Sequence, residues 1–419
     1  MNALKKYLQL SFWRDKRILF SLWMLMVAIS VALHMHNFNN FLIYKYTFWH
    51  AWEGKSIFEN YGDHFDVNHY GPIFSLIMAP FAVIPSLWVG VALWHLALGL
   101  FLWWAIREST LTNEQKVVVI WLTAHEMLNA LGMSQFNVAT AALILLTYSA
   151  IHRGKDMWAA FWIVVGILVK IYGIVGLAFF FFVKDKTKFV MWLVVWTVAL
   201  VALPMPFFGA DYIISQYVEW FRCLGEKGQE NLLSDFQNIS LLGMIRKIGY
   251  AVTAGLPAYY KVFKSAGKNP DVTNWWYSTW NDLWIIIPGL LYSALPWLRR
   301  KQYSSHSFQL MCLALVLIIV NIFSTGAENS SYIISMLGVA IWYVAVPWKR
   351  SRLDLCLLVF CFVFTSLSCT DLFPSDVRYY VIRPFALKAL PVVIIWLKLV
   401  WEMCTRDYLL SKSSYSFCK

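Results

Sequence analysis

The sequence predicts an all-α integral membrane protein with about 11 to 12 transmembrane segments. Hydrophobic residues make up 60% of its 419 residues and charged residues only 14%, whereas soluble domains carry about 25% charged residues. Apolar stretches long enough to cross a bilayer core recur along the whole chain, so we expect residues 1–419 to form a single membrane domain.

Most of the predicted segments are simple apolar stretches. They are 18–36, 86–106, 116–131, 135–151, 188–205, 280–298, 306–323, 331–347, 354–371 and 386–404. The stretch 157–183 is different, because basic residues flank it on both sides, at 153–155 and 184–188. Since Lys and Arg favour the cytoplasmic side, a single span would place one basic cluster on the wrong side. A hairpin of two short helices that turns near Lys170–Gly173 is therefore favoured over one span.

Basic residues in the short loops set the orientation. With the N-terminus inside, most Lys and Arg residues fall in cytoplasmic segments, and both termini are then cytoplasmic. The formal net charge of +12 reflects this topology and attracts anionic lipid headgroups. We expect membrane lipids as partners and no nucleic acid, because the basic residues are scattered over many loops.

The first outer loop, 37–85, is unusually polar for so apolar a chain. Its acids Glu53, Asp63 and Asp66 are candidates for a catalytic base, because glycosyl transfer to a hydroxyl requires a group that accepts its proton. We favour Asp66, which lies beside His69 and the turn that follows it. The alternative for each acid is a solvated loop charge.

Two helices are expected within this loop. The spacing of its aromatic residues predicts an amphipathic helix in the membrane interface, with the aromatic stripe toward lipid. The stripe consists of Phe41, Tyr44, Phe48 and Trp52. The stretch 73–85 is too short to span a bilayer and predicts a short helix at the outer surface.

The second large outer loop, 206–279, contains an amphipathic run over 211–224. Its later part carries Gln237, Asn238 and Arg246. Arginine is suited to bidentate phosphate binding, so Arg246 is a candidate ligand for a lipid phosphate. A surface role for Arg246 is the alternative.

Four further polar residues occupy positions that favour substrate contact. Lys170 lies deep in an apolar segment, where a cation is costly and is read as functional by default. Gln135 and Asn137 begin a span at its outer end, and Glu328 lies between two spans. Amides hydrogen-bond sugar hydroxyls, but they also cap helices. The alternatives for Lys170 and Glu328 are a paired or snorkelling lysine and a polar turn.

The chain shows no Walker A or GxGxxG pattern, and its cytoplasmic loops are too short for a nucleotide-binding domain. Chemistry driven by a cytoplasmic nucleotide is therefore disfavoured. We expect no metal or other cofactor. A small metal site formed by His64, Asp66 and His69 is the less favoured alternative.

Taken in order, these motifs resemble glycosyltransferase family 87, whose members are GT-C membrane enzymes that use polyprenyl-phosphate sugars. The resemblance runs from about 37 to 340. The similar positions are Tyr44, Gly54, Tyr70 with Pro72, Gly132 to Asn137, Lys170 with Tyr172, and Gln237 to Ser240 with Arg246. It implies a GT-C-like bundle that transfers a hexose, mannose-like, from a polyprenyl-phosphate donor to a lipid or glycan acceptor with inversion. It also implies an outward-facing site in a bacterial inner membrane.

One position departs from the family pattern. Asn40 stands where the family often carries Asp, and an amide cannot accept a proton as a base. Either a nearby acid takes over, or the family's base assignment does not transfer, or the chain is not catalytic. We favour a nearby acid, Asp66 before Glu53 and Asp63, and keep Asn40, Tyr44, His69 and Tyr70 as substrate contacts.

Two other functions stay open. A lipid-linked saccharide transporter or flippase would use charges within the membrane, but only Lys170 and Lys398 fall inside apolar segments. A ligase or polymerase would transfer whole oligosaccharides. Incubation of membrane vesicles with a labelled polyprenyl-phosphate hexose separates these functions.

Overall fold

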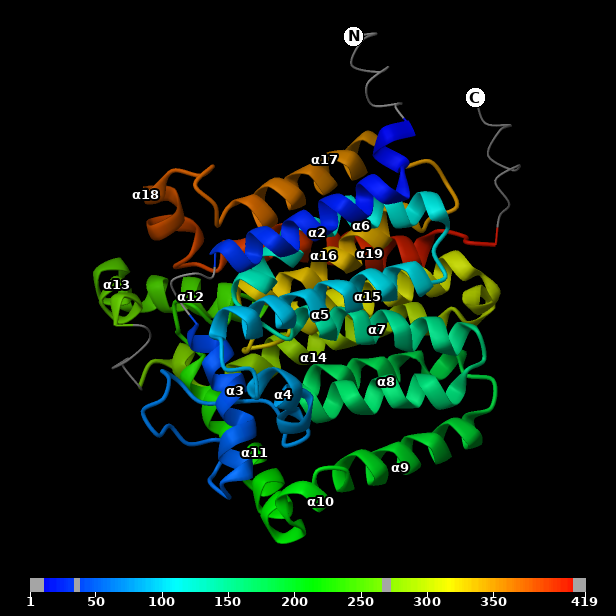
Figure 1. Cartoon of the computed structure of the whole chain (residues 1–419). Helices are drawn as coiled ribbons and strands as arrows, with labels where there is room; N and C mark the ends of the chain where they lie inside the picture. Colours follow the sequence, from blue (N-terminus) through cyan, green and yellow to red (C-terminus); the bar gives the residue numbers. More distant parts are fainter. Residues whose placement is uncertain (1–10, 34–37, 266–272, 410–419) are drawn as a thin grey trace, which may run out of the picture. The chain divides into compact units, whose positions relative to one another are not determined.

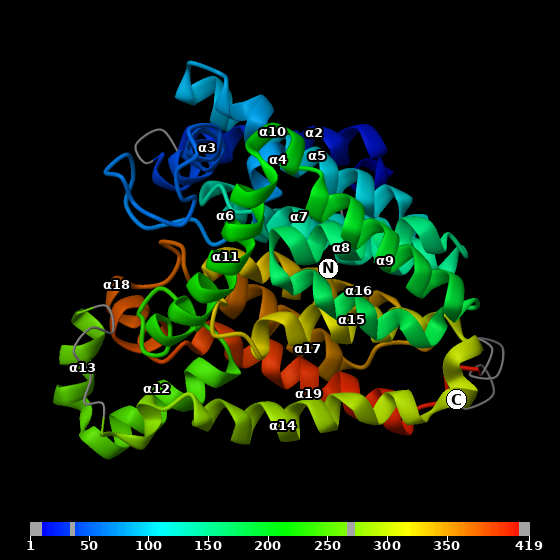
Figure 2. The same ribbon diagram turned by 90° about the horizontal axis from the view of Figure 1, so that it is seen from below.

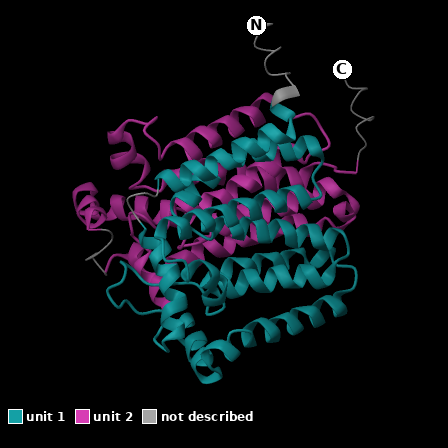
Figure 3. Cartoon of the chain, in the orientation of Figure 1, with its two compact units in different colours: residues 1–222 teal, residues 223–419 magenta. Residues whose placement is uncertain are grey.

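The computed structural model describes residues 11–33, 38–265 and 273–409. Helices make up 76% of the structure, and the described residues contain no strand, which confirms the all-α prediction. The predicted cytoplasmic ends of the chain fall outside these residues. The chain divides into two compact units, residues 1–222 and residues 223–419 (Figure 3). The prediction of a single domain stays a prediction, and the units are described separately.

The first unit is a bundle of apolar helices with a polar loop between two of them. Its elements are η1 (Ser11–Arg14), α2 (Lys16–Leu33), α3 (Asn39–Trp52), α4 (Phe74–Ala82), α5 (Leu87–Glu108), α6 (Asn113–Gly132), α7 (Asn137–His152), α8 (Asp156–Val169), η3 (Ile171–Phe182), α9 (Lys186–Ala202), α10 (Met205–Phe208) and the start of α11 (Ala210–Glu230). Helix α8 lies between α7 and α9 (Figures 1 and 2). Helix α4 is the short helix predicted for 73–85.

The hairpin predicted within 157–183 is confirmed. Helix α8 ends at Val169, Lys170 is extended with φ of −141°, and the 3₁₀ helix η3 begins at the next residue. The two helices pack closely because glycines face each other. A Cβ on Gly173 would lie 2.3 Å from the carbonyl carbon of Gly166, so no larger residue fits there without movement. Lys170 is thereby placed at the tip of a tightly packed turn.

The predicted orientation of the first-loop helix is wrong. Helix α3 forms as expected, but Phe41, Tyr44 and Phe48 are buried instead of facing lipid. The fourth residue of the stripe, Trp52, is exposed. Tyr44 packs against Phe74 of α4, with ring centroids 5.2 Å apart. Helical periodicity identifies residues that share a face, but it does not distinguish a lipid-facing stripe from one covered by neighbouring helices.

Several helices have the length and composition of membrane spans. By length and hydropathy, three helices among the described residues qualify, and a bent pair would make a fourth. They are Lys16–Leu33, Leu87–Glu108 and Lys186–Phe208, with the bent pair Ser375–Ile382 and Leu387–Thr405. Shorter apolar helices, among them α7, α8 and η3, accompany them. These helices support a membrane protein, while the count of 11 to 12 spans stays a prediction.

In the second unit, α15 (His306–Ile322) and α16 (Tyr332–Val344) are almost wholly buried and lie side by side, and α19 (Leu390–Thr405) packs against both (Figures 1 and 2). The other elements are α12 (Leu241–Ala254), α13 (Leu256–Lys264), η4 (Trp275–Tyr277), α14 (Trp280–Ala294), η5 (Leu295–Leu298), η6 (Arg300–Ser304), η7 (Asn329–Ser331), α17 (Arg352–Cys361), the π-helix η8 (Phe362–Leu367), α18 (Ser375–Val377), the π-helix η9 (Arg378–Ile382) and η10 (Leu387–Ala389).

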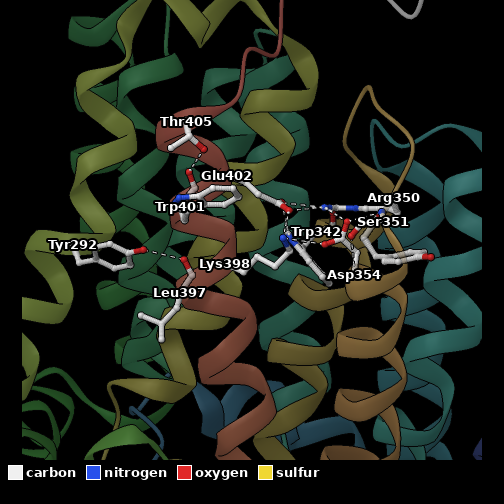
Figure 4. Close-up of polar contacts among 11 residues, drawn as sticks. Tyr292, Trp342, Arg350, Ser351, Asp354, Leu397, Lys398, Trp401, Glu402 and Thr405 are labelled. Carbon is white, nitrogen blue, oxygen red and sulfur yellow. Dashed lines mark hydrogen bonds and ion pairs between the residues drawn. The ribbon is translucent and has the colours of Figure 1, made fainter. Parts of the chain in front are cut away.

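A four-residue ion network joins α17, α19 and the segment before α17 (Figure 4). Lys398 lies 3.1 Å from a carboxylate oxygen of Asp354 and 3.2 Å from one of Glu402. Arg350 lies 3.0 Å from Glu402, whose carboxylate also accepts a hydrogen bond from the indole of Trp342. The network supplies two anions for two cations, which explains how α19 carries a lysine in an apolar stretch.

Candidate functional site

The tip of the α8–η3 turn is the centre of the polar site in the first unit. Lys170 donates a hydrogen bond from Nζ to Oδ1 of Asn137 over 2.7 Å. The same ammonium lies 4.8 Å from the ring centroid of Tyr172 and 5.8 Å from that of Tyr70. Two aromatic faces and an amide oxygen therefore stabilise a cation at the edge of an apolar segment.

Tyr70 connects this lysine to the other predicted contacts. Its hydroxyl donates to Oε1 of Gln135 over 2.7 Å and lies 3.2 Å from the hydroxyl of Tyr44. Its backbone is held by Asn68, and the next residue, Gly71, donates to the carbonyl of Val169 over 3.1 Å. The structure thus brings together five of the predicted residues, Tyr44, Tyr70, Gln135, Asn137 and Lys170.

A buried hydrogen-bonded chain holds the loop that carries Gln135. Ser134 has a left-handed backbone, with φ of +51°, and its hydroxyl lies 2.9 Å from Nε2 of His95. The other ring nitrogen of His95 lies 2.9 Å from the hydroxyl of Ser30. These residues were not among the predicted site residues, and the only signal for them in the sequence is a histidine in an apolar stretch. Asn40 contacts the same loop, because its amide donates to the carbonyl of Met133 over 2.8 Å.

Asp66 lies in the same loop as Tyr70, before it in the sequence. It has φ of +70°, a conformation that Asp and Asn tolerate, and its Oδ1 accepts from its neighbour Val67 over 2.9 Å. The same oxygen lies 3.8 Å from Nε2 of His69, and the Asp66 side chain is 56% exposed. His69 is tied to α11 because its carbonyl accepts from the indole of Trp220 over 2.9 Å. The Asp66 carboxylate is therefore largely solvent-exposed and lies near one imidazole.

The other two candidate acids pair with cationic or ionisable neighbours. Glu53 lies 2.7 Å from Nζ of Lys55 and raises the pKa of that lysine. Asp63 lies 3.3 Å from Nε2 of His50, a buried histidine whose pKa is lowered mainly by its burial. Because Asp66 also lies near an imidazole, that of His69, these pairs do not separate the three acids, and the preference for Asp66 stays a prediction.

The metal alternative finds no support in the described part of the chain. No three His, Cys, Asp or Glu side chains there converge closely enough to hold a metal ion. Nδ1 of His64 lies 2.9 Å from the backbone carbonyl oxygen of Asp66, and Nε2 of His69 lies 3.8 Å from its carboxylate.

Helix α11 holds the first outer loop through its polar face. The side chain of Gln216 accepts from the backbone N–H of Ile57, and Glu219 accepts from the hydroxyl of Ser56, both over 2.9 Å. Tyr212 donates to the carbonyl of Lys55 over 2.6 Å. The amphipathic run was predicted from the sequence, but the first outer loop was not predicted as the partner of its polar face.

In the second unit, the remaining predicted residues gather around one turn. Gln237 donates from Nε2 to Oε2 of Glu328 over 3.3 Å, and the backbone N–H of Ile239 donates to Ala327 over 2.8 Å. Asn238 is fully buried with φ of +54°, and its amide donates to the carbonyl of Leu232. Asn238 therefore shapes the turn, while Gln237 and Glu328 lie at its surface.

Arg246 is buried and already has an anionic partner. Its Nη2 lies 2.6 Å from Asp282, and its Nη1 donates to the carbonyls of Trp276 and Ser278. These contacts join α12 to α14 and favour a structural role. Phosphate binding by Arg246 stays a prediction.

Its neighbour Lys247 was not predicted as a site residue. Lys247 is fully buried, and burial lowers its pKa to about 7. Its Nζ donates to the carbonyl of Gln237 over 3.0 Å. Nearby, Asp235 lies 2.6 Å from Arg383, and burial raises the pKa of this carboxyl.

The decisive comparison is with protein families. The model of glycosyltransferase family 87 matches residues 68–325, more than half of the chain. The chain belongs to glycosyltransferase family 87. No curated protein matches it. This family 87 protein is accordingly a glycosyltransferase.

The matched range divides the candidate site of this family 87 enzyme. Tyr70, Gln135, Asn137 and Lys170 lie inside it, as do His69 and the predicted residues around Arg246. Asn40, Tyr44 and the three candidate acids lie before residue 68, and Glu328 follows residue 325. Of the five residues gathered around Lys170, all but Tyr44 therefore lie in the matched part. The three candidate acids lie outside it.

Proposed function

We propose that this family 87 enzyme transfers a hexose, mannose-like, from a polyprenyl-phosphate donor to a hydroxyl of a lipid or glycan acceptor. The observation that carries the proposal is the position of Lys170 at the turn of an apolar hairpin, beside Asn137 and two tyrosine rings. A cation at the end of apolar helices is suited to a phosphate attached to a hydrocarbon chain.

Lys170 would bind the donor phosphate. Its ammonium replaces part of its contact with Asn137 by a charge-assisted hydrogen bond to a phosphate oxygen. The positive charge stabilises the phosphate as it leaves the sugar, which lowers the barrier to transfer. Ionisable residues in apolar segments carry a solvation cost, and phosphate binding supplies a reason for this lysine to be there.

The amides and hydroxyls around Lys170 would bind the sugar. Gln135 and Asn137 offer donors and acceptors that match sugar hydroxyls, and Tyr44 and Tyr70 offer hydroxyls and ring faces. The left-handed turn at Ser134 holds the first of these amides next to Tyr70. His69 and Asn40 extend this polar surface at the rim.

Asp66 would act as the base. The acceptor oxygen attacks the anomeric carbon, the carbon–oxygen bond to phosphate breaks with its electron pair, and polyprenyl phosphate leaves. The acceptor proton passes to the Asp66 carboxylate, and attack opposite the leaving group inverts the anomeric centre. The lipid-linked sugar is itself the activated donor, so the proposed step uses neither metal nor nucleotide.

The topology predicted from the basic residues places this reaction at the outer face of a membrane, and we propose the bacterial inner membrane and its envelope glycans as the setting. The test is incubation of the purified protein in liposomes with radiolabelled polyprenyl-phosphate mannose and a membrane-lipid extract as acceptor. The proposal expects label in a new product and loss of that product with Lys170→Met. The control is Lys186→Met, at the start of α9.

Failure of transfer from any polyprenyl-phosphate hexose would overturn the proposal. Movement of the intact donor across the liposome membrane without a new product would instead indicate a transporter. Transfer of a preassembled oligosaccharide, but not of a single hexose, would indicate a ligase or polymerase.

A further inference from the structure

Helix α11 carries an exposed apolar stripe on the face opposite its contacts with the first outer loop. Ile214, Val218 and Phe221 are 54%, 69% and 63% exposed. Their spacing of four and three residues places them along one side of a helix. Gln216 and Trp220, which hold the loop, point to the buried side.

The exposed surface of α11 is polar on one side of this stripe. Asp211, Ser215 and Arg222 are also exposed, and helical geometry places them on the far side of Val218 from Ile214 and Phe221. Although α11 has 21 residues, it is not among the candidate spans. One side of α11 is thus covered by protein, a second is apolar and exposed, and a third is polar and exposed. Such a helix is suited to the boundary between protein, hydrocarbon and water.

The candidate span that precedes α11 also has exposed apolar side chains. Along Lys186–Phe208, the side chains of Val194, Val198 and Phe207 are exposed. Gly209, with φ of +94°, makes the turn from that segment into α11. Exposed valines on a candidate membrane span are suited to contact with lipid, and α11 begins directly after this span, where a hydrocarbon layer would end.

We propose that α11 lies in the outer-leaflet interface, with Ile214, Val218 and Phe221 among lipid acyl chains. The occupant of this surface is the bilayer itself. The polar edge at Ser215 faces the headgroups and water. The position of α11 in the membrane interface does not depend on the proposed function.

The lipid contact has a consequence for the site. The buried face of α11 holds the first outer loop through Tyr212, Gln216 and Glu219 and holds His69 through Trp220. Hydrocarbon contact on one face therefore sets the height of the loop that carries Asp66 relative to the bilayer. This second part rests on the proposed function, because it concerns presentation of Asp66 and Tyr70 to a lipid-linked substrate.

The first experiment measures lipid contact without any enzyme assay. Val218→Cys and the control Ser215→Cys are labelled with bimane in the full chain, with Cys356, Cys369, Cys404 and Cys418 replaced by serine. The proteins are reconstituted into liposomes that contain doxyl-labelled phosphatidylcholine. We expect strong quenching of bimane at position 218 and weak quenching at 215. Equal quenching at both positions, or stronger quenching at 215, contradicts the proposed position of α11 in the interface.

The second experiment measures the coupling to transfer. Val218→Asp places a carboxylate in hydrocarbon, which costs enough to lower transfer about ten-fold or more, whereas Ser215→Asp leaves transfer within about two-fold. Thermal unfolding checks that both variants fold. Unchanged transfer by Val218→Asp, despite quenching at position 218, overturns the coupling alone. If quenching is as expected but the unaltered protein transfers no sugar, the proposed function is wrong and the position of α11 in the interface still holds.

Discussion

Lys170 donates a hydrogen bond to Asn137 over 2.7 Å, and this bond joins the turn of one hairpin to the start of another helix. Both residues lie in the part of the chain that matches family 87. The ammonium is also flanked by the rings of Tyr70 and Tyr172. This single cation thus links the amide, aromatic and apolar parts of the candidate site.

Replacing Lys170 tests whether its charge is needed for sugar transfer. Lys170→Met keeps the length and apolar stem of the side chain but removes its charge, and we expect transfer to fall by about 10²-fold or more because the phosphate loses its stabilising cation. Donor titrations give kcat and KM for each protein. Lys186→Met is the matched control. Transfer by Lys170→Met at the rate of the unaltered protein would remove this lysine from the mechanism.

The α8–η3 hairpin depends on close glycine packing. Gly173→Ala adds a Cβ that would lie 2.3 Å from the backbone of Gly166, so we expect destabilisation of about 1–3 kcal/mol. Gly225→Ala in α11 is the control, because its Cβ meets nothing within 4 Å. Thermal unfolding in detergent measures both variants. An unchanged midpoint for Gly173→Ala would mean that the helices are further apart than described.

The ion network of α17 and α19 predicts a large stability effect (Figure 4). Glu402 has contacts with Arg350, Lys398 and the indole of Trp342. Glu402→Gln leaves two largely covered cations with one carboxylate, and removing one partner of a buried ion pair costs about 3–5 kcal/mol. The exposed Glu114→Gln is the control. Equal unfolding midpoints for the two variants would contradict a buried network.

Lys247 predicts a pH dependence of stability. Its pKa of about 7 in the folded protein lies below the usual lysine value, so between pH 7 and about 10.5 the unfolded state binds a proton that the folded state does not. Stability therefore rises with pH across this window and falls as pH drops toward 7, by at most about 1.4 kcal/mol per pH unit.

Lys247→Met should flatten this slope and raise the unfolding midpoint at pH 7, while Lys261→Met, an exposed control on α13, should leave the slope unchanged. Unfolding midpoints measured from pH 7 to pH 9 check both. A slope retained in Lys247→Met would show that another group titrates.

The sequence predicted some features of the fold better than others. The hairpin at Lys170 was predictable because the basic residues on both sides of 157–183 constrain topology. The orientation of α3 was not, because an aromatic stripe has the same periodicity whether lipid or protein covers it. The pairing of Lys398 with Asp354 also escaped prediction, since Asp354 lies on α17 and only packing brings it to α19, whereas Glu402 is one helical turn from Lys398.

The candidate site likewise contains residues that could be predicted from the sequence and residues that could not. The order of motifs indicated Tyr70, Gln135, Asn137 and Lys170, and the structure brings these residues together. His95 and Ser134 were missed because their contact joins α5 to the loop after α6. Arg246 had the right chemistry for a phosphate, but its pairing with Asp282 depends on the packing of α12 against α14.

The central claim is that an acid of the first outer loop, Asp66, serves this site as its base. Asp66→Asn is the sharpest variant, because asparagine also tolerates φ of +70° but cannot accept the proton. The measurement is the rate of transfer from labelled polyprenyl-phosphate mannose at saturating donor, beside Asp63→Asn and Glu53→Gln. We predict a loss of about 10³-fold for Asp66→Asn with donor binding retained, and less than about ten-fold for the other two variants. Near-normal transfer by Asp66→Asn would contradict the account.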